Sequence, residues 1–164
     1  MPSALLREQS LHVERPLPWA LYALNMQSTF SKKELAVEQL VCAVNLYLDE
    51  EYVPAITLAG AAEEILGKLL HFKGHKNALG VLVAYVTQFW APRRGIEKTE
   101  KQAIKDANEI KNHLKHFDGS NETVSFNPHF DAFLLIQRAI ENYNRLGEPP
   151  MELFEQFAQG SRDF

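Results

Sequence analysis

The chain has 164 residues, of which 46% are apolar and 23% charged, a composition that excludes disorder as its main state. Cys42 is the only cysteine, which excludes a scaffold of intrachain disulfides. The net charge of −4 argues against bulk electrostatic binding of nucleic acid but is compatible with a local basic site. The sequence has no run of 18 apolar residues and no secretory signal pattern, so we expect a cytoplasmic protein with no membrane partner.

The length fits one domain, and we predict a single helical domain over 1–164. Prolines at positions 2, 16 and 18 each restrict the residue before them, so residues 1–30 are expected to form an irregular N-terminal segment. The core bundle is expected over about 31–146. A short C-terminal helix is expected over 150–158, after the break at Gly147-Glu148-Pro149-Pro150.

Five longer segments show helical apolar spacing or an apolar length that favours a helix. Their predicted bounds are 31–49, 54–74, 77–90, 98–117 and 128–146. The third segment is apolar throughout, and its valines also fit a buried strand, but its length favours a buried helix. Helices of similar length with short connections predict an all-α fold, an antiparallel up-and-down helical bundle of four long helices plus short accessory helices.

Two of these helices carry further predictions about burial. Cys42 lies between Val41 and Ala43 in a core helix, so we expect a buried, unreactive thiol. The helix over 128–146 is expected to place one apolar stripe in the core. That stripe consists of Phe130, Phe133, Leu134, Ile136, Ala139, Ile140 and Tyr143.

The helix over 98–117 carries a polar face that its core contacts do not explain. Ala103, Ala107, Ile110, Leu114 and Phe117 are spaced by three and four residues and face the bundle. Opposite or beside that stripe lie Lys105, Glu109, Asn112, His113 and His116. These groups suit acid–base chemistry and anion binding, but they are also typical of a solvated face near a helix C-terminus.

A metal site on the same face is an alternative, because Glu109, His113 and His116 stand at i, i+4 and i+7. Zinc needs three or four convergent ligands, and these ligands need hydrogen-bond partners that hold them in place. The spacing of this row is not a recognised zinc pattern. We therefore expect no metal and no cofactor. The segment is also locally basic: residues 93–116 hold seven basic and four acidic residues, a net charge of +3 that could contact a few phosphates.

Glu63 is the other residue that stands out. Gly60, Glu63 and Gly67 share one strip of the helix over 54–74, and interior glycines usually permit close approach of another backbone or a ligand. In the structural interpretation two helices pack tightly there and Glu63 extends to water. In the functional interpretation its carboxylate lines a cleft between helices or between subunits.

The residues from Lys111 to His116 resemble the signature of the HEPN superfamily, in which an arginine is followed four to six residues later by a histidine. Asparagine often follows the arginine directly; here Asn112 and His116 match, and Lys111 replaces the arginine. The alanine-rich helix over 55–70 also resembles the family, and the likeness covers roughly 31–146. Together with Arg138-Ala139-Ile140-Glu141-Asn142-Tyr143, the motif is similar to a group of uncharacterised bacterial proteins.

The resemblance implies a homodimer whose motifs face an intersubunit cleft, and RNA cleavage by the RNA's own 2′-hydroxyl group. It implies that His116 acts as general base or acid, Lys111 stabilises phosphate charge and Asn112 orients the reacting groups, with His113 or Glu63 assisting. Lysine lacks arginine's bidentate fork, and Lys111 lies about 140° around the helix from His116. Whether the chain is an enzyme therefore stays open at this point.

Three hypotheses follow. The first is a HEPN-like dimeric module without catalysis, which binds a nucleotide, RNA or a partner protein. The second is a metal-independent endoribonuclease of the toxin–antitoxin or defence type that uses Lys111, Asn112 and His116 and has an antitoxin-like partner. The third is an unrelated helical bundle that binds a metal or a small molecule.

Overall fold

The computed structural model describes residues 28–116, 119 and 122–160. Within these residues the fold is all-α, with six α-helices and no β-strand. The helices are α2 (Lys32–Leu48), α3 (Tyr52–Phe72), α4 (Ala78–Tyr85), α5 (Glu100–His113), α6 (Pro128–Arg145) and α7 (Glu152–Gly160). The predicted fold class is confirmed, while the antiparallel up-and-down order of four long helices stays a prediction.

The described helices all belong to one compact unit within residues 31–164. The expected irregular segment over 1–30 lies outside the described residues, apart from positions 28–30. In the part of the chain that the structure describes, every helix is too short or too polar to cross a lipid bilayer.

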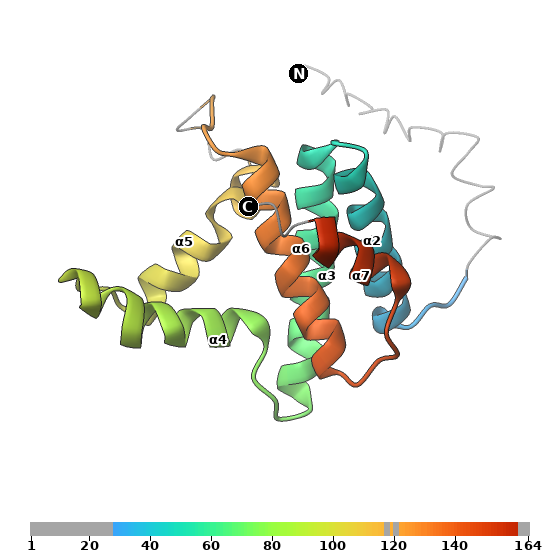
Figure 1. Ribbon diagram of the computed structural model, residues 1–164, viewed down its shortest axis with the longest axis horizontal. Coiled ribbons are helices and arrows are strands. Elements are labelled where there is room, and N and C mark those ends of the chain that lie inside the picture. Colours follow the sequence, from blue (N-terminus) through green and yellow to red (C-terminus); the bar gives the residue numbers. More distant parts are fainter. Residues whose placement is uncertain (1–27, 117–118, 120–121, 161–164) are drawn as a thin grey trace, which may run out of the picture. The chain divides into compact units, whose positions relative to one another are not determined.

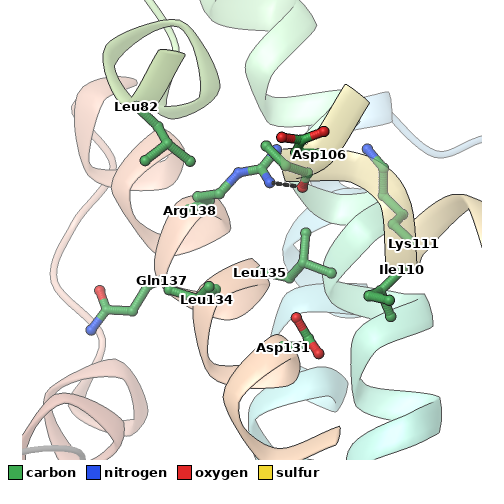
Figure 2. Close-up of a pocket in the computed structure, with 10 residues that line it drawn as sticks. Leu82, Asp106, Ile110, Lys111, Asp131, Leu134, Leu135, Gln137 and Arg138 are labelled. Atoms are coloured by element: carbon green, nitrogen blue, oxygen red, sulfur yellow. Dashed lines mark hydrogen bonds between the residues drawn. The ribbon is translucent and has the colours of Figure 1, made fainter. Parts of the chain in front are cut away.

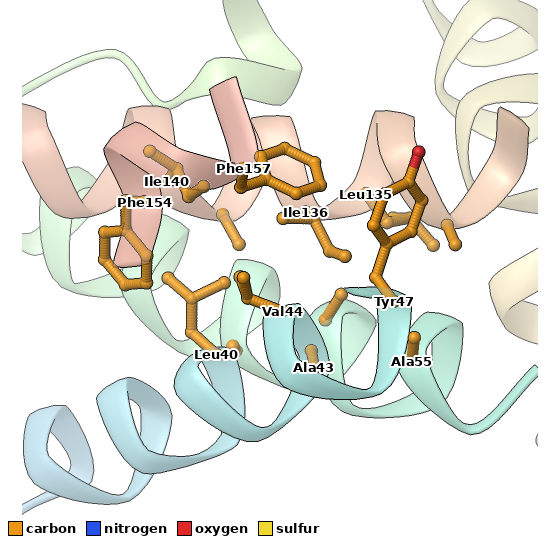
Figure 3. Close-up of a cluster of buried hydrophobic side chains, with 14 of the residues drawn as sticks. Leu40, Ala43, Val44, Tyr47, Ala55, Leu135, Ile136, Ile140, Phe154 and Phe157 are labelled. Carbon is orange, nitrogen blue, oxygen red and sulfur yellow. The ribbon is translucent and has the colours of Figure 1, made fainter. Parts of the chain in front are cut away.

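The core lies between α2, α3, α6 and α7 (Figure 3). Small residues of α3, Ala55, Ala59 and Ala62, are fully buried and let its neighbours approach closely. From α7, Phe157 stacks on Phe133 and meets Tyr47 edge to face, with ring centroids 5.6 and 5.0 Å apart. The short C-terminal helix therefore completes the core.

A capping box stands at the start of α2. Ser31 Oγ accepts from the backbone N–H of Glu34, and a Glu34 carboxylate oxygen accepts from the backbone N–H of Ser31 at 2.8 Å. This hydrogen bond lowers the pKa of Glu34. The expectation of a buried Cys42 is wrong: the core face of α2 contains Leu40 and Val44, and Cys42 lies about 200° from each and is exposed.

The segment over 77–90 is helical, as predicted, but it is largely exposed. α4 continues as a π-helical segment, η1 (Val86–Trp90), and a 3-10 turn, η2 (Pro92–Arg94). Figure 1 shows α4 extending away from the packed helices and α5 running back toward them at an angle to α4. Only Ala78 and Val83 of α4 are buried, because α5 and α6 cover one part of this helix and leave the rest uncovered.

The predicted core stripe of α6 needs two corrections. Phe130 and Leu134 are exposed, because they lie on the opposite side of the helix from its buried residues. Four residues of the stripe are buried as predicted: Ile136, Ala139, Ile140 and Tyr143. The buried face also includes two polar residues, Arg138 and Asn142, which the apolar pattern did not identify. These two side chains lead to the candidate site.

Candidate functional site

Glu63 of α3 is the centre of a buried ion cluster. Its side chain is only 3% exposed, so the interpretation in which it extends to water is wrong. One carboxylate oxygen lies 2.8 Å from a terminal nitrogen of Arg138, and the other lies 3.4 Å from Nζ of Lys111. The carboxylate therefore joins α3 to both α5 and α6.

The strip of α3 that holds Glu63 is shaped for this contact. A Cβ added at Gly60 would lie 2.6 Å from Cδ of Lys111, so only glycine leaves room for the lysine stem. A Cβ added at Gly67 would lie 3.1 Å from the side-chain nitrogen of Asn77, the N-cap of α4, and 3.3 Å from that of Asn142. The glycines therefore permit close approach, as predicted, but the approaching groups are side chains of α5, α6 and the start of α4 rather than a backbone or a ligand.

Arg138 connects the cluster to the backbone of α5. Its guanidinium donates to the carbonyl oxygen of Ala107 at 2.7 Å and to Oδ1 of Asn108 at 3.2 Å. Its Nε is buried and has no hydrogen-bond partner in the described part of the chain. Two cations thus face one carboxylate, which gives the group of Glu63, Lys111 and Arg138 a formal charge of +1.

Asn142 extends the polar network to α4. Its amide nitrogen donates to the backbone carbonyl of Glu63 at 3.1 Å, and its amide oxygen accepts from the backbone N–H of Ala78 at 2.7 Å. A fully buried asparagine needs such partners, because an unpaired amide in the core costs about 1–3 kcal/mol. Arg138 and Asn142 adjoin apolar residues of the predicted stripe, such as Ala139 and Tyr143, and that position was the only sign of their burial in the sequence.

The motif residues at the end of α5 separate into two groups. Asn112, His113 and His116 are exposed, as the predicted polar face required, whereas Lys111 is 7% exposed and points into the chain. The helix ends at His113, four residues before its predicted end. His116 follows shortly after, and its backbone N–H donates to the carbonyl of Asn112. The structure thus brings Lys111 to Glu63 and leaves both histidines on the surface.

Charges around this helix end are unevenly distributed. Lys68 hydrogen-bonds to Glu64 and lowers its pKa, and the nearby charges of Lys111 and Lys115 lower it further. Nε2 of His113 lies 4.0 Å from a carboxylate oxygen of Glu109 on the same helix. No group of three or more His, Cys, Asp or Glu residues converges for metal binding among the residues described.

A hollow of about 240 Å³ lies beside the cluster, between α4, α5 and α6. Figure 2 shows Leu134 and Leu135 on one side of it and Ile110 on the other, with Arg138 between them and Leu82. A second hollow of about 390 Å³ continues along α4 and shares Leu82 with the first. The second is lined mainly by apolar side chains, whereas the first combines apolar residues with the charged or polar side chains of Asp106, Lys111, Asp131, Gln137 and Arg138.

Comparison of the chain with protein-family models, curated proteins and solved structures found no match. The HEPN resemblance therefore stays a prediction that rests on the motif and its helical context.

Proposed function

We propose that this chain is a HEPN-like module that forms a homodimer and binds RNA without cleaving it. The observation that carries the proposal is the burial of Lys111. Cleavage of the implied type needs a cation at the scissile phosphate, next to the point where His116 would take the proton of the 2′-hydroxyl group or give one to the leaving 5′-oxygen. The Lys111 ammonium instead lies against Glu63, and its stem is enclosed by Gly60.

The exposed end of α5 supports RNA as the ligand. Four exposed side chains there supply hydrogen-bond donors or a positive charge for phosphate oxygens: Asn112, His113, Lys115 and His116. The locally basic segment over 93–116 adds electrostatic attraction in a chain that is acidic overall. Binding through a few phosphates fits this balance better than coating of a duplex.

The uncovered side of α4 supports a homodimer. Residues 77–91 contain no charged residue, yet Val81, Leu82, Tyr85 and Phe89 are exposed. Leu134 of α6 extends this apolar face across the hollows described above. Neighbouring apolar side chains that are exposed together are typical of an interface. A second copy of the chain related by a twofold axis would cover the same apolar face on each subunit.

The dimer is tested by light scattering on variants of this face. Leu82→Asp and Leu134→Asp should each yield monomers, whereas Val53→Asp, at an exposed apolar residue of α3, should leave the dimer intact. A monomeric wild-type protein at micromolar concentration would contradict the dimer.

Catalysis is tested by incubating labelled RNA with wild-type protein and with His116→Ala. We expect binding by both and equal background cleavage in both. Cleavage that disappears in His116→Ala would instead support the second candidate, an endoribonuclease. The exposure of Asn112, His113 and His116 at one helix end is the observation that favours this alternative.

A further inference from the structure

A second basic surface lies at the opposite end of α3 from the contact between Gly60 and Lys111. Over 65–92 the sequence has no acidic residue and three lysines, Lys68, Lys73 and Lys76. The remainder of the chain carries a net charge of −7. Lys73 and Lys76 of this segment lie in the loop between α3 and α4, beside His71 and His75, and all four are exposed.

The same loop presents an aromatic ring to solvent. Phe72 is 91% exposed, the highest value among the exposed large apolar residues of the described chain. The backbone around it is well ordered by hydrogen bonds: the N–H of His75 donates to the carbonyl of Leu70, and that of Gly74 to the carbonyl of His71. With Gly74 at a φ of 79°, this is a Schellman cap, which holds the loop in one conformation.

Beside the loop lies a hollow of about 570 Å³, which is large enough for a nucleotide. It is formed by the loop, by one side of α4 and by the beginning of α5. Its lining includes His71, His75, Lys76, Gln88, Glu100 and Ile104. Leu82, Tyr85 and Trp90 line the other hollow along α4, and the two hollows share Val83.

We propose that this loop and hollow form a binding surface for single-stranded RNA, in which Phe72 stacks on a base and Lys73 and Lys76 contact phosphates. Stacking on an exposed aromatic ring within a basic surface is the usual way of holding unpaired bases, since every base has a π-face. Gln88 and Glu100 offer hydrogen-bonding groups to base edges in the hollow. The inference rests on the proposed RNA-binding function and adds a contact that the α5 motif does not supply.

The geometry makes this a site distinct from the motif. Phe72 follows Gly60 by twelve residues, so the loop lies about 18 Å along α3 from the contact with Lys111. Figure 1 shows the α3–α4 connection and the end of α5 at opposite ends of α3. A strand that contacts both sites would need several nucleotides, which favours an extended single strand over a mononucleotide.

A lipid surface is the other ligand to which a basic loop with an exposed aromatic ring could bind. The structure favours RNA, because a single phenylalanine offers too little apolar area for stable membrane binding.

The test is fluorescence anisotropy with a labelled 12-nucleotide RNA and the full chain. Phe72→Ala should bind roughly 5- to 150-fold more weakly than wild type, from the usual contribution of one stacked base. Phe72→Trp should retain wild-type affinity, and Phe72→Leu should bind as weakly as Phe72→Ala, because only a ring can stack. Phe130→Ala is the matched control and should bind like wild type, because Phe130 is also exposed but lies at the start of α6.

The charges are tested by salt titration and by competition. Replacing Lys73 and Lys76 by glutamine should reduce the slope of log affinity against log salt by about 1.4, whereas Lys32→Gln should leave it unchanged. A perfect duplex of the same sequence should compete poorly, because its bases are already stacked and paired. Equal competition by the duplex would overturn the stacking role.

The outcomes separate this inference from the proposed function. If wild type binds the RNA and Phe72→Ala binds equally well, the loop is not the site, although the proposed function survives. If wild type binds no RNA, both fail. If Phe72→Ala instead abolishes binding to vesicles of phosphatidylserine and phosphatidylcholine and leaves RNA binding unchanged, the surface is a lipid site. The large exposure of Phe72 predicts that all three substitutions fold, which circular dichroism confirms before each titration.

Discussion

Gly60 of α3 lies directly against the aliphatic stem of Lys111, and a Cβ at that position would come within 2.7 Å of both Cγ and Cδ. This contact explains two features of the chain together. A glycine inside a helix costs about 1 kcal/mol relative to alanine, and here it allows a lysine from another helix to reach Glu63. The contact also directs the Lys111 ammonium inward, on a different side of α5 from the exposed His116.

Gly60→Ala should therefore destabilise the protein by about 1–3 kcal/mol, as overpacking does in a filled core. The lysine stem cannot swing aside without breaking its ion pair with Glu63. In a Lys111→Ala background the same change should become neutral or stabilising, because the clash is gone and alanine favours the helix. Urea unfolding of the four proteins measures this coupling, and Gly160→Ala, whose Cβ would meet nothing within 4 Å, is the control. Equal effects of Gly60→Ala in both backgrounds would contradict the contact.

Glu63→Gln should be the most destabilising single change in the ion cluster. Removing the carboxylate leaves the charges of Lys111 and Arg138 buried without their counterion, a loss of about 3–5 kcal/mol. The neighbouring Glu64→Gln removes only an exposed i, i+4 pair with Lys68 and should cost no more than about 0.5 kcal/mol. Chemical denaturation of both variants makes the comparison, and similar losses would show that Glu63 is not the centre of the cluster.

Lys111→Met should have a much smaller effect than Glu63→Gln. The methionine fills the same space, and the carboxylate of Glu63 keeps Arg138 as a partner, so the charges in the core then balance. We expect a change in the free energy of unfolding within about 1 kcal/mol and unchanged affinity for RNA. A stable Lys111→Met protein that no longer binds RNA would assign Lys111 to the binding surface and contradict its structural role.

Much of the helical pattern was readable from the sequence, because helix caps and apolar spacing are local signals. Ser31 with Glu34, and Asn127 before Pro128, mark helix starts that the structure confirms. The polar face of α5 was also predicted correctly, since Asn112, His113 and His116 are all exposed.

The partners of Glu63 could not be predicted in the same way. Its contacts with Lys111 and Arg138 join residues 48 and 75 positions apart, and a helical wheel gives the face of a residue without naming its neighbour. The same limit explains why the prediction of a buried helix over 77–90 was wrong. An apolar helix is buried only where another element covers it, and in the described chain much of α4 has no such cover.

Tyr47 gives a prediction for alkaline pH. Its hydroxyl is hydrogen-bonded to Nε2 of His129 at 2.7 Å, and burial, with a smaller contribution from Tyr52, raises its pKa. In the unfolded chain the phenol ionises near its ordinary pKa of about 10, so above that pH the unfolded state releases a proton that the folded state keeps. This group therefore makes stability fall as the pH rises from about 10 toward its higher folded pKa.

Tyr47→Phe should cost about 1 kcal/mol at pH 8, because the hydrogen bond to His129 is lost. Since phenylalanine does not ionise, the variant lacks this part of the alkaline decline, and the difference from wild type should shrink between about pH 10 and pH 11. Urea unfolding at a series of pH values measures both effects. A difference that stayed constant over this range would mean that Tyr47 ionises equally easily in the folded and unfolded chains.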